Sequence, residues 1–109
     1  TLVFNAPEQL AHIHYGPSVD VWALGCVLVC LMRSCRTPYS TDVLTASRVP
    51  ELLLNISTGA TRPELPPEHV IQSVVWGCCR TKAAERLSAE EAARQIAELS
   101  RISRCIDTT

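Results

Sequence analysis

The chain has 109 residues, of which 47% are hydrophobic, and its formal net charge is −1. This composition indicates one folded domain rather than a disordered chain. Nine Arg and one Lys are scattered along the sequence, which argues against a nucleic-acid-binding surface or an acidic-membrane site. The longest uncharged apolar run, residues 21–32, is shorter than the ~20 residues that a membrane span needs.

The first half of the chain reads as two helices. Residues 7–11 should form a short helix with Pro7 in its first turn. A longer helix is predicted over residues 18–32, where Ser18 is a candidate cap and Asp20 is an acid favoured by the helix dipole. Because this helix is apolar on nearly every face, we expect it to be surrounded by protein.

The second half also reads as helical. A polar loop over residues 33–47 leads to a helix that Pro50 opens and Gly59 ends. Proline-rich residues 62–67 should be extended, and residues 68–79 carry apolar side chains at helical spacing.

The last predicted helix follows residues 88–91, whose Ser-Ala-Glu-Glu sequence has the form of a capping box. One face of this helix is traced by Ala92, Ile96, Leu99 and Ile102. Strand signals are scarce throughout. The fold class is therefore predicted to be mainly α, with about five helices assembled around residues 18–32.

Six cysteines stand at positions 26, 30, 35, 78, 79 and 105, without a Cys-x-x-Cys pair. We interpret them as free thiols that pack as small hydrophobes in a reducing cytoplasm. A zinc site that joins them to His12, His14 or His69 is a weaker hypothesis, because no cysteine pair has finger-like spacing.

Three short strings then appear in an order typical of one family. They are Ala6-Pro7-Glu8, the Ser-Val-Asp-Val-Trp-Ala-Leu-Gly of residues 18–25, and Ala84-Glu85-Arg86. An Ala-Pro-Glu signature closes the activation segment of protein kinases. The chain resembles the C-terminal part of the large lobe of a protein kinase domain over residues 1–102, with residues 103–109 as a tail. The resemblance implies the helical C-lobe portion of an α+β fold, with the N-lobe and catalytic loop absent.

The resemblance also assigns site residues. The substrate-positioning loop would comprise Thr1, Leu2, Val3 and Phe4. Thr1 falls where serine/threonine kinases carry a threonine that contacts the catalytic base, so serine/threonine specificity is favoured. The structural motif would comprise Ala6, Pro7, Glu8, Asp20, Trp22, Gly25 and Arg86.

Within that motif, the resemblance implies that Arg86 pairs with Glu8 and that Asp20 accepts hydrogen bonds from the catalytic-loop backbone. Val27 and Leu31 fall at positions that support the internal spine of the family. One departure is Lys82-Ala83, which stands where Asp-Pro is usual and puts the shape of the local turn in question.

The implied activity of the complete domain is transfer of the ATP γ-phosphate to Ser or Thr of protein substrates, with ATP and Mg²⁺ as cofactors. This chain has no His-Arg-Asp, no Asp-Phe-Gly and no glycine-rich loop, and its single lysine is Lys82. We therefore expect no catalytic, cofactor-binding or metal-binding residue within it, and no phosphoryl transfer by the chain alone.

Thr1 in place of an initiator Met favours a fragment. A fragment that lacks the catalytic loop should expose part of the apolar surface of residues 18–32. The expected partners are protein substrates or regulatory proteins, without nucleic acid and without a membrane span.

Two alternatives stay open at this point. The chain could be a non-catalytic, pseudokinase-like module that binds other proteins. It could also be an unrelated helical bundle with chance motifs, in which case Glu8 and Arg86 would lie far apart.

Overall fold

The structure, a computed structural model, describes residues 2–34, 37–39, 48–63, 65 and 70–107, and for Leu2 and residues 102–107 it describes the backbone alone. Over these ranges the chain forms helices and irregular segments but no strand, which confirms the mainly α prediction. The elements are η1 (Leu2–Phe4), α1 (Pro7–Leu10), α2 (Ser18–Arg33), α3 (Val49–Thr58), α4 (Gln72–Cys78), η3 (Ala83–Glu85) and α5 (Ala89–Asp107).

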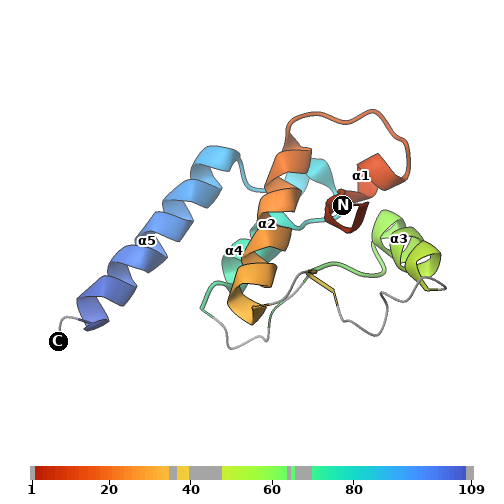
Figure 1. The fold of residues 1–109 in the computed structure, drawn as a ribbon. Coiled ribbons are helices and arrows are strands. Elements are labelled where there is room, and N and C mark those ends of the chain that lie inside the picture. The colour runs from red at the N-terminus through yellow and green to blue at the C-terminus, as the bar shows by residue number, and fades with distance from the viewer. Residues whose placement is uncertain (1, 35–36, 40–47, 64, 66–69, 108–109) are drawn as a thin grey trace.

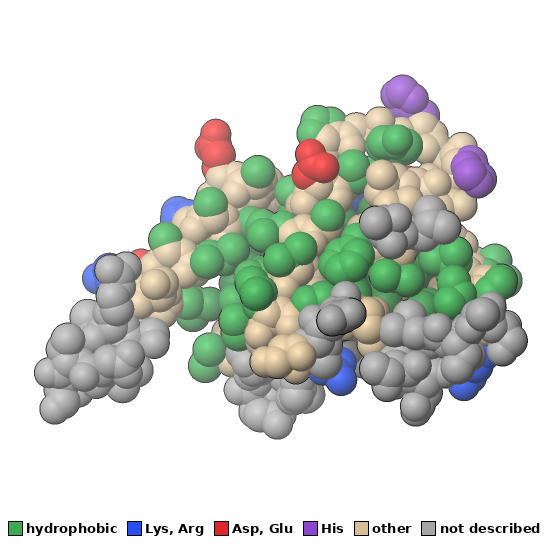
Figure 2. Space-filling model, viewed as in Figure 1, with side chains coloured by type: hydrophobic (Ala, Val, Ile, Leu, Met, Phe, Trp, Pro, Cys, Tyr) green, Lys and Arg blue, Asp and Glu red, His purple; other side chains and the backbone are tan. Residues whose placement is uncertain are grey.

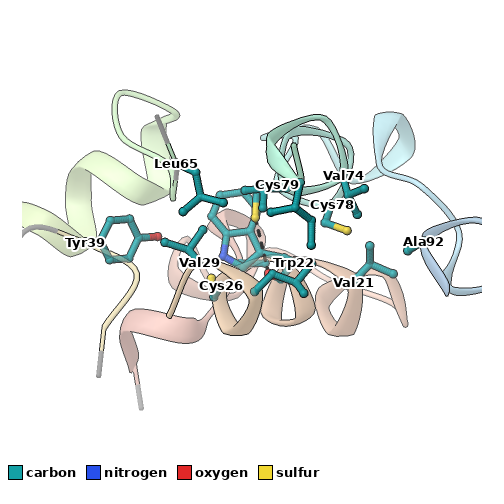
Figure 3. Close-up of a cluster of buried hydrophobic side chains, with 14 of the residues drawn as sticks. Val21, Trp22, Cys26, Val29, Tyr39, Leu65, Val74, Cys78, Cys79 and Ala92 are labelled. Atoms are coloured by element: carbon teal, nitrogen blue, oxygen red, sulfur yellow. Dashed lines mark hydrogen bonds between the residues drawn. The ribbon is translucent and has the colours of Figure 1, made fainter. Parts of the chain in front are cut away.

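Helix α2 is the centre of the assembly. It packs against α4, while α1 packs against α3 on one side and α5 leans away on the other (Figure 1). The core is built around the fully buried Trp22, Cys26 and Val29 of α2, which meet side chains of α4 and the segment after it (Figure 3). The very apolar helix predicted from the sequence is therefore the hub of the fold.

Gly25 lets α2 and the end of α4 approach closely. A Cβ added at this position would overlap Cys79 Sγ and lie 3.0 Å from Cys78 Cβ. Because both cysteines are fully buried, there is little room for them to move aside. The motif glycine thus has a packing role here.

One face of α2 is exposed rather than surrounded by protein. Val27 is 44% exposed and Leu31 63%, and Met32 follows them at the end of the helix. Hydrophobic side chains gather over α2 and along its flanks on the face shown in Figure 2. The expectation of an exposed apolar surface is confirmed, whereas the expectation of protein on nearly every side is wrong for the part of the chain that the structure describes.

Two predicted helix starts need correction. Ser18 is the first residue of α2 rather than its cap, because Pro17 before it already has helical dihedral angles, with φ −62° and ψ −18°. Pro17 has no polar side-chain atom and makes no side-chain capping bond. Helix α4 starts at Gln72 rather than at residue 68, although residues 68–69 lie outside the described ranges. The Gln72 side chain instead accepts from Leu65 N–H at 2.9 Å and donates to Leu65 O at 2.7 Å, which holds that irregular segment against α4.

Other predicted ends are confirmed. Gly59 ends α3 with a φ of 85°, in the left-handed region that glycine favours. At the start of α5, Glu91 N–H donates to Ser88 Oγ at 3.0 Å. The Glu91 carboxylate accepts from Arg94 and Gln95, so half of the capping box forms.

The loop over residues 33–47 and the extended segment over residues 62–67 are described only in part. Arg62, Pro63 and Leu65 belong to no regular element, as expected, and Pro38 and Tyr39 are buried. Arg33 ends α2, Ser34 caps it in the left-handed conformation and Thr37 is buried. The other residues of both predictions lie outside the described ranges.

Candidate functional site

The candidate site is centred on a bidentate ion pair between α1 and the end of η3. Arg86 Nη1 donates to Glu8 Oε2 at 2.6 Å, and Nη2 donates to Glu8 Oε1 at 2.7 Å. The Arg86 side chain is fully buried, and that of Glu8 is 12% exposed. Two parallel charge-assisted bonds fix both the distance and the orientation of the partners.

The same guanidinium also binds three backbone carbonyls. Nε donates to Arg80 O at 2.8 Å, Nη1 to Ser18 O at 3.3 Å and Nη2 to Thr81 O at 3.3 Å. A buried Arg needs partners for its donors, and these contacts supply them. Arg86 therefore ties α1, the first turn of α2 and the turn before η3 to one another.

Trp22 completes the site. The Arg86 guanidinium carbon lies 5.2 Å from the centroid of the Trp22 ring, within the range of a cation–π contact. Trp22 itself is fully buried. One residue from each of the three strings, Glu8, Trp22 and Arg86, thus lies in one contact group.

The pairing also sets the protonation of Glu8. Burial alone raises the pKa of the carboxyl, but the hydrogen bonds from Arg86, a backbone bond and the Arg86 charge outweigh it. The pKa of Glu8 therefore lies below its ordinary value. The carboxylate stays ionised near neutral pH and serves as an anchor.

The other motif residues occupy distinct places. Ala6 and Pro7 are buried, and Ala6 N–H donates to Gln9 Oε1 at 2.8 Å, which caps α1. Asp20 lies in the first turn of α2 and is exposed, where the helix dipole favours it. Its predicted contact with a catalytic loop stays a prediction.

The predicted substrate-positioning loop is described from its second residue onward, because Thr1 lies outside the described ranges. Leu2 lies in η1, and the side chains of Val3 and Phe4 are partly buried against the core. This segment therefore packs on the body of the molecule as it enters α1.

The turn that replaces Asp-Pro is regular. Glu85 N–H donates to Lys82 O at 3.0 Å, and Arg86 N–H donates to Ala83 O at 3.2 Å. The carbonyls of Lys82 and Ala83 thus stabilise η3, and Arg86 directly after it lies within reach of Glu8.

Sequence reasoning missed the carbonyl partners of Arg86 and its contact with the Trp22 ring. Every residue carries a carbonyl, so no sequence signal marks the ones that Arg80, Ser18 and Thr81 contribute. The contact with Trp22 joins positions 64 residues apart in sequence, since 86 − 22 = 64.

The cysteines of the core are free thiols, as predicted for Cys26, Cys78 and Cys79. Burial raises the pKa of Cys78 to about 11. A hydrogen bond with Cys26, together with burial, raises that of Cys79 as well. Such thiols are poor nucleophiles, so they act as small packing groups.

Three charged residues discussed above lie in separate places within the described ranges. Glu8 is paired with Arg86, Asp20 is exposed in α2, and Lys82 is exposed before η3. Among the described residues, no three His, Cys, Asp or Glu side chains come together as metal ligands. Nor does any described helix have the length and apolar character to cross a membrane.

A hollow of about 540 Å³ lies beside α1. Its lining residues are Asn5, Gln9, His12, Ile13, His14 and Tyr15. His12 and His14 are exposed residues between α1 and α2.

Comparison with known proteins matches residues 1–96 to the protein kinase domain. Mitogen-activated protein kinase kinase kinase 1 is 29% identical in Rattus norvegicus and 33% in Mus musculus, each over 94 residues that cover 84% of this chain. Mitogen-activated protein kinase kinase kinase 20 of Arabidopsis thaliana is 39% identical over 66 residues, or 61% of this chain.

The chain spans 6% of the length of the two mammalian relatives and 18% of the plant one. The match covers all three strings and the ion pair that joins the first to the third. An unrelated bundle with chance motifs is therefore ruled out. The chain belongs to the protein kinase domain family, with the fold of its helical C-lobe portion.

Proposed function

We propose that this chain forms the C-terminal part of the large lobe of a serine/threonine protein kinase domain. In its complete form, that domain would transfer the ATP γ-phosphate to Ser or Thr of protein substrates. The observation that carries this proposal is the buried Glu8–Arg86 pair on the Trp22 ring, which joins the three motif strings. The kinase relatives and the position of Thr1 in the motif favour the same activity.

The role of the ion pair in this proposal is to anchor the end of the activation segment. Only two residues separate η1 from α1, and Glu8 holds α1 to Arg86. A fixed α1 gives the substrate-positioning loop a fixed base. Positioning of this kind contributes a large share of catalysis in phosphoryl transfer, where the protein does little covalent chemistry.

The exposed face of α2 would receive the parts of the domain that hold ATP and Mg²⁺. Asp20, Val27 and Leu31 lie at exposed positions along α2, at spacings of seven and four residues. That spacing places them on one side of a helix. On this surface, the Asp20 carboxylate could accept hydrogen bonds from backbone N–H groups. Val27 and Leu31 could pack there against apolar side chains.

The experiment begins with the coding sequence upstream of Thr1. A single polypeptide that contains the upstream residues followed by this chain should show magnesium-dependent transfer of labelled phosphate from ATP to Ser or Thr of a general protein substrate. The 109-residue chain alone should show none. Arg94→Ala in the longer product serves as a control, because Arg94 belongs to an exposed pair on α5. Activity of the 109-residue chain alone would contradict the proposal.

The alternative is a non-catalytic module that binds proteins, favoured by the exposed Val27 and Leu31. It predicts a longer product that lacks His-Arg-Asp and Asp-Phe-Gly and transfers no phosphate. Under either function we propose a reducing, cytoplasmic location. The free buried thiols of Cys26, Cys78 and Cys79 support that location.

A further inference from the structure

The C-terminal end of α3 is covered by a side chain from the turn before η3. Gly59 caps α3, and a Cβ added to it would lie 3.0 Å from Thr81 Cγ2 and 3.2 Å from Thr81 Oγ1. The backbone of this end is also fixed, because Gly59 N–H donates to Ile56 O and Thr61 N–H donates to Asn55 O, both at 3.1 Å. Thr81 therefore rests on a defined surface of α3.

Thr81 is connected to the ion pair as well. Its carbonyl accepts from Arg86 Nη2 at 3.3 Å, and the same nitrogen donates to Glu8 Oε1 at 2.7 Å. Glu8 belongs to α1, which packs against α3. The contacts thus form a closed ring that runs from α3 through Gly59, Thr81, Arg86 and Glu8 to α1 and back to α3.

The segment before α1 cannot move independently of that ring. Ala6 is fully buried, and its carbonyl accepts from Gln9 N–H at 3.0 Å and from Leu10 N–H at 3.2 Å. Only Asn5 and Ala6 separate η1 from α1. A shift of α1 against α3 would therefore carry η1 with it.

We propose that Thr81 is a positioning residue that, through its contact with Gly59, sets the orientation of α3 against α1 and thereby the place of η1. The role of η1 as part of a substrate-positioning loop rests on the proposed function. The positioning contact itself does not depend on it. The contact is steric rather than ionic, so it can be altered without removing the Glu8–Arg86 pair.

The first test is a pair of substitutions with a rescue. Gly59→Ala places a Cβ against Thr81 in a left-handed conformation, and it should lower the melting midpoint by about 4–8 °C. It should also speed hydrogen exchange at the amides of residues 9–11, which bond to carbonyls at the start of α1. Adding Thr81→Ala removes the two closest atoms and should restore slow exchange there, while the backbone strain at Gly59 keeps the midpoint low.

Matched controls separate the contact from a general loss of stability. Gly16→Ala should change neither readout, because nothing lies within 4 Å of a Cβ at Gly16. Thr81→Val keeps the shape of the side chain and should leave exchange in α1 slow, whereas Thr81→Ala alone should speed it modestly. The two Thr81 variants also decide the question if Gly59→Ala does not fold. Unchanged exchange in both Gly59→Ala and Thr81→Ala, or no rescue in the double variant, would overturn the proposal.

The second test uses the active product that contains this chain. Gly59→Ala should raise the KM for a Ser/Thr peptide about tenfold and leave the KM for ATP unchanged. Adding Thr81→Ala to Gly59→Ala should bring the peptide KM back down. Equal effects on both KM values would contradict a role in placing the substrate loop. If the unaltered product shows no kinase activity, the proposed function fails, and the exchange experiment still decides whether Thr81 positions α1.

Discussion

The Glu8–Arg86 and Glu91–Arg94 pairs use the same two residue types in opposite surroundings. The first joins positions 78 residues apart, and its Arg side chain is fully buried. The second lies within one turn of α5, and its Arg side chain is 67% exposed. A third pair, Glu98–Arg101, repeats the exposed arrangement further along the same helix.

The surroundings of an ion pair determine what it contributes to the fold. Exposed pairs within a helix contribute little, because water and salt screen them. A buried pair gains strength from its surroundings but pays a desolvation cost, so its net stabilisation is small while removal of one partner is severe. The buried pair therefore determines which distant segments meet, and the exposed pairs make small local contributions to α5.

Arg86→Ala should destabilise the chain more than any other substitution considered. It leaves Glu8 without its partner and frees the carbonyls of Arg80, Ser18 and Thr81, so the free energy of unfolding should fall by about 3–5 kcal/mol. Urea denaturation followed by circular dichroism measures the loss. Arg86→Lys keeps the charge without the bidentate geometry and should fall between Arg86→Ala and the unaltered chain. A loss below about 1 kcal/mol for Arg86→Ala would show that breaking the buried pair lowers the free energy of unfolding no more than breaking an exposed pair.

Glu8→Gln should have the next largest effect. Glutamine keeps one acceptor oxygen but turns an amide NH₂ toward the donors of Arg86, which should cost about 1.5–3 kcal/mol. The same denaturation experiment applies, with Glu91→Gln as the matched control on α5. Equal losses in the two variants would remove the distinction between the pairs.

Acid should weaken the buried pair in a defined direction. Because the pKa of Glu8 in the folded chain lies below the reference value of 4.5, its contribution to stability is fully present above about pH 4.5. That contribution is lost as the pH falls through the lowered folded pKa. Stability measured between pH 7 and pH 3 should therefore fall less in Glu8→Gln than in the unaltered chain. Identical pH profiles would contradict a lowered pKa at Glu8.

Arg94→Ala should have the weakest effect of the series, with a loss of unfolding free energy well below that of the two variants of the buried pair. Bonds from Arg94 and Gln95 lower the pKa of Glu91 to about 2, but the carboxylate is open to solvent. The loss should shrink further in 1 M salt, where the Debye length is about 3 Å. A salt-independent loss of several kcal/mol would show that exposure does not decide the strength of these pairs.

Local signals in the sequence determined much of the fold. Pro7, Gly59 and Ser88 mark helix ends through their own backbone preferences or short-range hydrogen bonds, and these need no distant partner. The three strings, read as a family resemblance, placed Glu8 beside Arg86. These features could be predicted because each depends on neighbouring residues or on a motif of fixed order.

Helix starts were less predictable where the local signals compete. Ser18 is a good capping residue, but Pro17 before it already has helical dihedral angles and takes the cap position. Val70 and Ile71 share the apolar spacing of α4, yet α4 begins at Gln72, whose side chain bonds to the backbone of Leu65. Contacts outside the helix thus determine where it begins.

The amino-acid pattern was sufficient to predict an apolar helix over residues 18–32, and the family resemblance was sufficient to name Glu8 and Arg86 as a pair. Which face of that helix is buried depends on packing in three dimensions, because a helix apolar on all sides has no periodicity that distinguishes Val29 from Leu31. The same holds for the contacts of Arg86 with the Trp22 ring and with three carbonyls. Such contacts depend on where distant segments meet in space, and a carbonyl that can accept a hydrogen bond is present in every residue of the chain.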